Sequence, residues 1–385
     1  MNEEPTVNTT TITPDLLRGA LDHEYTERGL VVHRLPAWAR SQVPDAQLAS
    51  AETQPAGVRL AFRTTARVVE LDAVRTKRNF VGLPPRPDGF YDLFSNGVFT
   101  HSSPSNGGDV VTIDMATGGV EVSAGTVGTM KFALDPGVKD VEIWLPHNET
   151  VELVSLRSDS PIEPSPTPSR PRWLHYGSSI SQGSNAATPS ATWIGAVASS
   201  SRLDVVNLGF GGSAMLDPFV SRVLRDEAAD VISLEIGINI VNSDAMRLRA
   251  FVPAVHGFLD TVRDGHPDVP IYVISPIYCP IHEDTPGPGA FDPEELAEGR
   301  VAFMATGVAG PGKLTLRVIR EELDRIVAQR QDLNLVYVDG LDLYGVDDFA
   351  DAPLPDRLHP DEATHQLIAH RFREVSATSS NSYFD

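Results

Sequence analysis

The fold is decided by a short apolar run and the polar turn that follows it, Trp173-Leu-His-Tyr176 and Gly177-Ser178-Ser179-Ile180-Ser181-Gln182-Gly183. Further apolar runs follow at intervals that leave room for helices: Leu203-Asp-Val-Val-Asn207, Val231-Ile-Ser-Leu-Glu-Ile236, Ile271-Tyr-Val-Ile-Ser275 and Leu335-Val-Tyr-Val-Asp339. Strands that alternate with helices predict a parallel sheet covered on both faces. Ligands of such sheets bind at the carboxyl ends of the strands, so we expect a site in the residues after each run.

The N-terminal part has a different pattern, in which short runs alternate apolar and polar residues and are separated by Gly, Pro, Asn and Asp. The clearest of these runs are Gly57–Arg63, Arg67–Asp72, Val110–Asp114 and Val141–Leu145. This pattern predicts an antiparallel β-sandwich. A short helix is expected before it, around Leu16 to Leu21.

A proline-rich stretch separates the two patterns. Five prolines fall within Ser158–Pro171, and proline cannot continue a helix or a central strand. The predicted organisation is therefore a β-sandwich domain at residues 1–157, an extended linker at 158–171 and an α/β domain at 172–385. A chain of 385 residues is long enough for two domains.

Composition excludes several classes of partner. The formal net charge is −21 and the longest basic cluster is Arg75-Thr-Lys77-Arg78, so a nucleic acid is not expected as a partner. There is no apolar stretch of the roughly 18 residues that a spanning helix needs, and the first residues do not resemble a secretion signal. The single cysteine, Cys279, cannot form an internal disulfide. These features predict a cytoplasmic protein without a membrane partner; they leave the oligomeric state open.

Polar residues follow the predicted strands in four blocks, which together resemble those of the SGNH (GDSL) hydrolase family. The blocks are Gly177–Gly183, Asn207-Leu-Gly209-Phe-Gly211-Gly212, Gly237-Ile238-Asn239 and Asp356-Arg-Leu-His359-Pro360. The resemblance covers about residues 172–375. It implies a flavodoxin-like three-layer α/β/α domain, and it implies that the preceding sandwich is a jelly roll similar to a carbohydrate-binding module.

The resemblance also implies a role for each block. Ser179 takes the position of the nucleophile, His359 that of the base that accepts its proton, and Asp356 that of the acid that orients the imidazole. The expected donors to the oxyanion are the backbone N–H groups of Ser179 and Gly212 and the side-chain amide of Asn239. Catalysis of this kind needs no cofactor and no metal.

Two positions depart from the family pattern. Ser178 stands where the first block usually has aspartate, which leaves Ser178 as an alternative nucleophile. Ile240 stands where the third block usually has aspartate. A serine pair at the start of a helix can also be only a helix cap.

Other interpretations compete for single features. Gly209-Phe-Gly211-Gly-Ser-Ala214 fits the loose dinucleotide pattern G-x-G-x-x-A, and Glu235 lies in range of a ribose-binding acid. This explains one loop and leaves the other blocks without a role. His175 and His256 are expected to be packed or solvated rather than ligands, and Cys279 to be buried. The long segment at 280–315 is expected to be a lid or a substrate-shaping insertion, or else a surface loop.

An acyl-Ser179 intermediate allows two outcomes. Water as acceptor makes the protein an esterase of carbohydrates or small esters, and a hydroxyl-bearing molecule makes it an acyltransferase. Over its whole length the chain also resembles the acyltransferases of this family that act in tetracycline-type polyketide pathways. That resemblance implies transfer of a salicylyl group from its CoA thioester to a hydroxyl acceptor. A catalytically inactive carbohydrate-binding protein is the third possibility.

Overall fold

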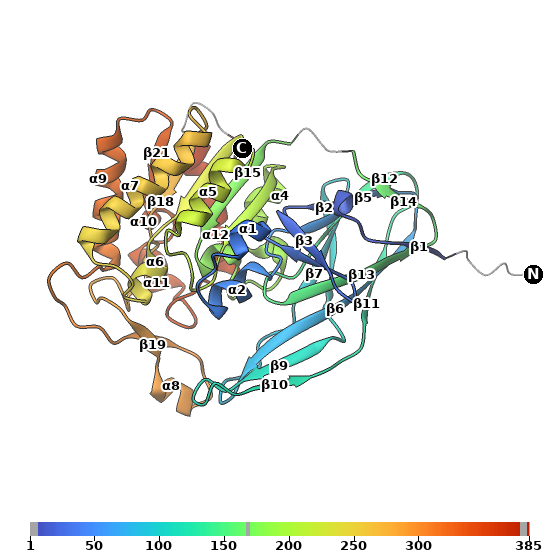
Figure 1. The fold of residues 1–385 in the computed structure, drawn as a ribbon, viewed down its shortest axis with the longest axis horizontal. Coiled ribbons are helices and arrows are strands. Elements are labelled where there is room, and N and C mark those ends of the chain that lie inside the picture. Colours follow the sequence, from blue (N-terminus) through green and yellow to red (C-terminus); the bar gives the residue numbers. More distant parts are fainter. Residues whose placement is uncertain (1–6, 167–169, 378–382, 385) are drawn as a thin grey trace, which may run out of the picture. The chain divides into compact units, whose positions relative to one another are not determined.

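The computed structural model describes residues 7–166, 170–377 and 383–384 (Figure 1). The chain divides into two compact units. The first comprises Met1–Arg34, Glu52–Arg170 and Ala187–Ser190, and the second comprises Leu35–Ala51, Pro171–Ala186 and Ala191–Asp385. The main division falls at the end of the proline-rich stretch. It differs from the predicted domain limits because Leu35–Ala51 pack with the second unit and Ala187–Ser190 with the first.

The first unit contains two sheets, which are antiparallel apart from the parallel pair of β6 and β9. One sheet has the order β10-β9-β6-β13-β4-β3, with β1 beside β13 and β11 beside β6; the other has the order β14-β5-β12-β7-β8, with β2 beside β5. Leu71 and Phe132 of the first sheet share one fully buried core with Phe62 and Ile143 of the second. Two sheets around a common core form the predicted sandwich.

The elements of the first unit are β1 Asn8–Thr10, η1 Pro14–Leu16, β2 Leu17–Arg18, β3 Asp22–Tyr25, β4 Leu30–His33, β5 Arg59–Thr64, β6 Val68–Phe80, β7 Phe90–Ser95, β8 Val98–Pro104, β9 Asp109–Ile113, β10 Val120–Ser123, β11 Gly128–Ala133, β12 Lys139–Trp144, β13 Thr150–Ser158 and β14 Ile162–Pro164.

Two local predictions for this unit were wrong. The helix expected around Leu16 to Leu21 is a single 3-10 turn, and Leu17–Arg18 instead pair with β5. Both Leu16 and Leu17 are buried in the sandwich core, and pairing with β5 satisfies the backbone of Leu17–Arg18 as a strand. Part of the predicted linker is also a strand, since Ile162–Pro164 pair with β5. This strand lies at the edge of its sheet, where proline is tolerated.

The second unit is built on a parallel five-stranded sheet with the order β16-β15-β17-β18-β21. All five apolar runs form strands as predicted. Helices α4 and α12 pack against each other, and α5, α7 and α9 form a row (Figure 1). The strand order reverses at β15: β16 lies on one side of it, and β17, β18 and β21 follow on the other side. In sheets of this type the ligand binds at that point of reversal.

The elements of the second unit are α1 Ala37–Arg40, α2 Ala46–Glu52, β15 Arg172–Gly177, α3 Ser179–Gln182, η2 Pro189–Ala191, α4 Trp193–Ser200, β16 Asp204–Gly209, α5 Pro218–Asp226, β17 Val231–Glu235, α6 Ile238–Asn242, α7 Leu248–Gly265, β18 Ile271–Ile274, β19 Gly289–Phe291, α8 Pro293–Ala297, β20 Phe303–Ala305, α9 Leu316–Arg330, β21 Leu335–Val338, α10 Gly340–Leu343, α11 Val346–Asp351 and α12 Glu362–Ala377; η2 begins in the first unit and α2 ends there.

The insertion at 280–315 folds into an antiparallel hairpin. Strands β19 and β20 pair from Gly289 with Ala305 to Phe291 with Phe303, and α8 lies in the turn between them.

Within the described ranges, no helix has both the length and the apolar character to cross a bilayer. A cluster of three or more side chains able to hold a metal is likewise absent from the residues that the structure describes.

Candidate active site

The turn after β15 places two adjacent serines in different environments. Ser178 is the N-cap of α3, and its Oγ accepts the N–H of Ile180 at 3.2 Å. Ser179 is the first residue of α3, and its Oγ lies 2.9 Å from Nε2 of His359. The hydroxyl beside the imidazole is therefore that of Ser179, while that of Ser178 caps the helix.

The turn after α11 brings an acid to the other side of the same imidazole. Nδ1 of His359 lies 2.8 Å from Oδ2 of Asp356, and the other oxygen of Asp356 accepts the backbone N–H of His359 at 2.7 Å and of Leu358 at 3.0 Å. A carboxylate at Nδ1 holds the proton there, which leaves Nε2 to accept the Ser179 proton. The structure thus brings Ser179, His359 and Asp356 into one hydrogen-bonded line.

The charge state of Asp356 follows from its surroundings. Burial is the largest influence and raises the pKa of this carboxyl, but the hydrogen bonds from the ring and backbone of His359 and from the backbone of Leu358 outweigh it. The net result is a pKa below the ordinary value, so Asp356 is ionised at neutral pH. Asn185 adds a further hydrogen bond from Nδ2 to Oδ2 of Asp356, at 3.2 Å.

The three expected oxyanion donors come from three different strand ends. Asn239 lies in α6 after β17, and its Oδ1 accepts the N–H of Ala214 at 3.0 Å, which leaves Nδ2 as the free end of the amide. Gly212 lies in the loop after β16 with a φ of 72°, a value that favours glycine. Among the hydrogen bonds of the described residues, neither the N–H of Gly212 nor that of Ser179 has an acceptor. These donors are available to a ligand.

Side chains from other segments fasten the Gly212 loop. Oε1 of Gln182 accepts the N–H of Gly211 at 2.7 Å, and Nδ2 of Asn207 donates to the carbonyl of Ser181 at 2.9 Å. Nε2 of Gln47, in α2, donates to the carbonyl of Gly211 at 2.8 Å. The loop is thus held between the nucleophile turn and a helix from the N-terminal part of the chain. No local pattern in the sequence pointed to Gln47, because it lies more than 160 residues from the loop.

A buried carboxylate also lies beneath the serine turn. Oε2 of Glu235, the last residue of β17, accepts the N–H of Ser178 at 2.7 Å and the hydroxyl of Ser181 at 2.9 Å. Burial raises the pKa of Glu235 above its ordinary value. In this chain the turn has serine in place of the usual aspartate, and an acid from the neighbouring strand binds it instead. The sequence shows Glu235 at the end of a predicted strand, but there it was considered only as a ribose-binding acid.

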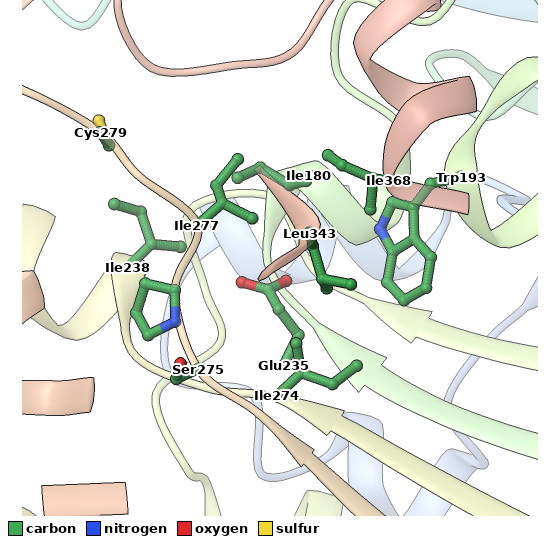
Figure 2. A pocket seen from close by; sticks show the side chains of 11 residues that line it. Ile180, Trp193, Glu235, Ile238, Ile274, Ser275, Ile277, Cys279, Leu343 and Ile368 are labelled. Atoms are coloured by element: carbon green, nitrogen blue, oxygen red, sulfur yellow. The ribbon is translucent and has the colours of Figure 1, made fainter. Parts of the chain in front are cut away.

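Figure 2 shows the side chains that line an apolar cavity next to this turn. Ile180 and Ile238, the neighbours in sequence of Ser179 and Asn239, line it together with Cys279, and the carboxylate of Glu235 points into it. The lining does not include Ser179 itself. The cavity is therefore lined by neighbours of the nucleophile and not by the nucleophile itself, and its apolar walls account for the raised pKa of Glu235.

The competing interpretations find no support in this arrangement. A ribose could not reach Glu235, which is only 7 % exposed, and α5 begins at Pro218, well beyond the glycine loop. His175 is buried with Nδ1 2.7 Å from Oγ of Ser233, and burial lowers its pKa to about 3, as suits a neutral core histidine. Burial raises the pKa of the Cys279 thiol to about 12.

The hairpin of the insertion contacts the acid–base turn. The N–H of Phe303 donates to the carbonyl of Asp356 at 2.9 Å, and the ring of Phe303 meets the imidazole of His359 edge to face, with 5.6 Å between centroids. Arg357 binds Asp292 and Glu295 of the insertion, each at 2.7 Å. The insertion is thus packed against the site, and the surface-loop alternative does not describe it.

Part of the second unit, including the serine turn, matches one family model. Residues 172–280 match the GDSL-like Lipase/Acylhydrolase family. This GDSL-like region contains the first three of the four blocks. The fourth block, Asp356–Pro360, lies outside the matched residues.

Solved structures resemble the whole chain, including both units. The salicylyl-acyltransferase SsfX3 from a tetracycline biosynthetic pathway has a TM-score of 0.81 and 24 % identity and covers 98 % of this chain and 99 % of its own. A Bacteroides ovatus protein described as a GDSL-like lipase has a TM-score of 0.68 and 17 % identity, with 97 % of each chain covered.

A family two carbohydrate esterase from Clostridium thermocellum, solved with cellohexaose, has a TM-score of 0.54 and 14 % identity and covers 82 % of this chain and 90 % of its own. At such identities the likeness is one of fold. Among curated proteins, none matches the sequence significantly.

Proposed function

We propose that this protein is a serine acyltransferase that carries its acyl group on Ser179. One observation carries the proposal: Oγ of Ser179 lies 2.9 Å from Nε2 of His359, whose Nδ1 lies 2.8 Å from Asp356. This is the arrangement in which a serine hydroxyl loses its proton to a neutral imidazole as it attacks a carbonyl.

In the first half-reaction, Oγ of Ser179 bonds to the carbonyl carbon of a thioester while its proton passes to Nε2 of His359. The negative charge that develops on the carbonyl oxygen is stabilised by the N–H groups of Ser179 and Gly212 and by Nδ2 of Asn239. The carbon–sulfur bond then breaks, and the imidazolium gives its proton to the leaving thiolate. Asp356 stabilises the charged imidazole throughout, and acyl-Ser179 remains.

In the second half-reaction, a hydroxyl acceptor gives its proton to Nε2 of His359 and bonds to the acyl carbon. Collapse of the second tetrahedral intermediate breaks the bond to Ser179 and returns the proton to its Oγ. The step is the reverse of the first with a different oxygen or sulfur at the imidazole. No step requires a metal or a cofactor.

For the substrates we propose salicylyl-CoA as donor and a hydroxyl of a polycyclic polyketide as acceptor. The likeness to SsfX3 over nearly the full length of both chains supports this choice. An esterase acting on acetylated carbohydrates is the second candidate, supported by the likeness in fold to the family two esterase solved with cellohexaose.

The test is to incubate the protein with salicylyl-CoA, with and without a polycyclic hydroxyl acceptor, and to follow thioester loss and product mass. Thioester loss that depends on the acceptor, with a product heavier by one salicylyl group, is the expected result. Release of free salicylate at the full rate without acceptor would contradict transfer. Acetylated xylo-oligosaccharides in a parallel assay test the esterase alternative.

A fluorophosphonate probe tests the nucleophile independently of the substrate. Ser179→Ala should abolish labelling, whereas Ser178→Ala should keep the label on the peptide that contains Ser179. A wild-type protein that folds but takes no label would overturn both enzyme proposals and favour a carbohydrate-binding protein.

A further inference from the structure

The hairpin at 289–305 presents two aromatic rings beside the proposed acid–base residue. Phe291 and Phe303 stack with 5.0 Å between centroids and an interplanar angle of 30°. Phe291 and Phe303 are both only partly buried. Phe303 is also the ring that meets the imidazole of His359.

Contacts with the acid–base turn fix the position of this pair. Phe303 donates its backbone N–H to the carbonyl of Asp356, and Asp292 donates its N–H to the carbonyl of Ala302 across the hairpin. The ion pairs of Arg357 with Asp292 and Glu295 tie the turn of the hairpin, next to Phe291, to the same segment. The rings therefore hold a defined position relative to His359 before any substrate binds.

The chemistry decides which part of a substrate meets this pair. The carbonyl oxygen points to the donors at Gly212 and Asn239, whereas the leaving group and the acceptor both exchange a proton with Nε2 of His359. An acceptor oxygen at hydrogen-bond distance from Nε2, about 3 Å, carries its substituent beside the ring that packs on that imidazole. The acceptor alcohol, like the leaving group before it, is thus bound on the imidazole side of the site, and the acyl group on the side of the oxyanion donors.

We propose that Phe303 and Phe291 form a binding subsite for an acceptor alcohol that carries an apolar ring. This inference rests on the proposed acyl-Ser179 intermediate and adds the class of acceptor and the residues that select it. A ring seated on the two phenylalanines buries apolar surface on both partners and occupies the space from which water would attack. The subsite consequently favours transfer over hydrolysis for ring-bearing alcohols.

The test measures how the acetyl-enzyme is divided between water and an added alcohol as acceptors. The protein is given p-nitrophenyl acetate in buffer that contains either 2-phenylethanol or methanol, and the ratio of acetate ester to free acetate is measured. Because both products arise from the same intermediate, this ratio does not depend on how fast the intermediate forms. A change in folding stability alone would not alter it.

For the wild-type protein we expect 2-phenylethanol to capture the acetyl group at least about tenfold better than methanol at equal concentration, as the burial of one ring implies. Phe303→Ala should lower the transfer ratio for 2-phenylethanol about tenfold and change that for methanol less than about twofold. Phe303→Leu and Phe291→Ala should fall between. Phe349→Ala is the matched control, since it removes a half-buried ring in α11 that is paired with Tyr278, and it should leave both ratios unchanged.

Fluorophosphonate labelling of each variant separates this inference from the proposed function. A wild-type protein that neither takes the label nor releases p-nitrophenol refutes both. If it labels and hydrolyses but does not prefer 2-phenylethanol, or if Phe303→Ala leaves the preference intact, the subsite alone is refuted. If Phe303→Ala slows labelling and leaves the transfer ratio unchanged, Phe303 positions the imidazole and does not bind the acceptor.

Discussion

At the residue scale, the amide of Asn239 has a different role at each end. Its oxygen accepts the N–H of Ala214, and its nitrogen is the proposed oxyanion donor. Asn239→Ala removes both, so we expect turnover of p-nitrophenyl acetate to fall by about 10²–10³. The loss of an acceptor for a buried N–H should also lower the free energy of unfolding, by about 1–3 kcal/mol. Initial rates and urea unfolding measure the two effects.

Asn242 supplies the control for this variant. It lies one turn further along α6, and its Oδ1 is 3.1 Å from Nε2 of His282, away from the serine turn. Asn242→Ala should leave turnover within a few-fold of the wild-type value. Equal losses of turnover in the two variants would mean that Asn239 acts only by supporting α6.

Glu235 makes the stability of the protein depend on pH. Burial raises the pKa of this carboxyl in the folded state above its ordinary value near 4.5. As pH rises above that value the unfolded state loses the proton first, so the free energy of unfolding falls until the folded-state pKa is passed. Glu235→Gln keeps an oxygen that can accept from Ser178 and Ser181 but cannot titrate.

The difference in the free energy of unfolding between wild type and Glu235→Gln isolates this one group, because other titrations are common to both proteins. We expect the wild type to lose stability relative to the variant as the pH of a urea titration is raised from about 4.5. A difference that stays constant with pH, or grows in favour of the wild type, would contradict the assignment.

At the element scale, the turn that bears Asp356 and His359 has an unusual backbone at its centre. Arg357 has a φ of 66°, a conformation that costs residues other than glycine about 1–2 kcal/mol. Its ion pairs with Asp292 and Glu295 are partly exposed and add little to stability. We therefore expect Arg357→Gly to unfold at a urea concentration close to that of the wild type, and Arg357→Ala to be less stable than Arg357→Gly by about 1 kcal/mol.

Urea unfolding of the two variants, monitored by tryptophan fluorescence, decides this prediction. Because both variants lack the guanidinium, their difference reports only the backbone. If alanine proves as stable as glycine, the turn relaxes its conformation when the hairpin contacts are removed.

The elements also show which parts of the site a sequence can predict. Ser179 and His359 lie 180 residues apart, yet their pairing could be predicted because the blocks that contain them resemble those of the SGNH family. Gln47, Asn185 and Phe303 reach the site through long-range packing, which leaves no periodicity or local motif. Their contacts became visible only with the fold.

At the scale of the whole molecule, the proline-rich stretch is an incomplete guide to the independent parts of the chain. Leu35–Ala51 precede most of the sandwich in sequence but pack with the second unit. Leu35, Ala39 and Leu48 of this segment are almost fully buried in the whole chain. A sequence pattern records where local structure changes, whereas the units depend on which apolar side chains share a core.

This interleaving makes a prediction about dissection of the chain. A fragment cut at the proline-rich stretch, residues 171–385, lacks α1 and α2 and exposes the apolar surface that Leu35, Ala39 and Leu48 cover in the full chain. It also lacks Gln47, which holds the carbonyl of Gly211 next to a proposed oxyanion donor.

We expect this fragment to melt at a lower temperature than a chimera in which residues 35–51 are joined to it through a flexible Gly-Ser linker, and to take a fluorophosphonate label more slowly. A second chimera, in which Leu35 and Leu48 are both changed to Asp, keeps the added length but not the apolar contacts, and it should behave like the bare fragment. If the bare fragment and the first chimera melt and label alike, Leu35–Ala51 contribute nothing to the stability or the site of the second unit, and the proline-rich stretch is the true boundary.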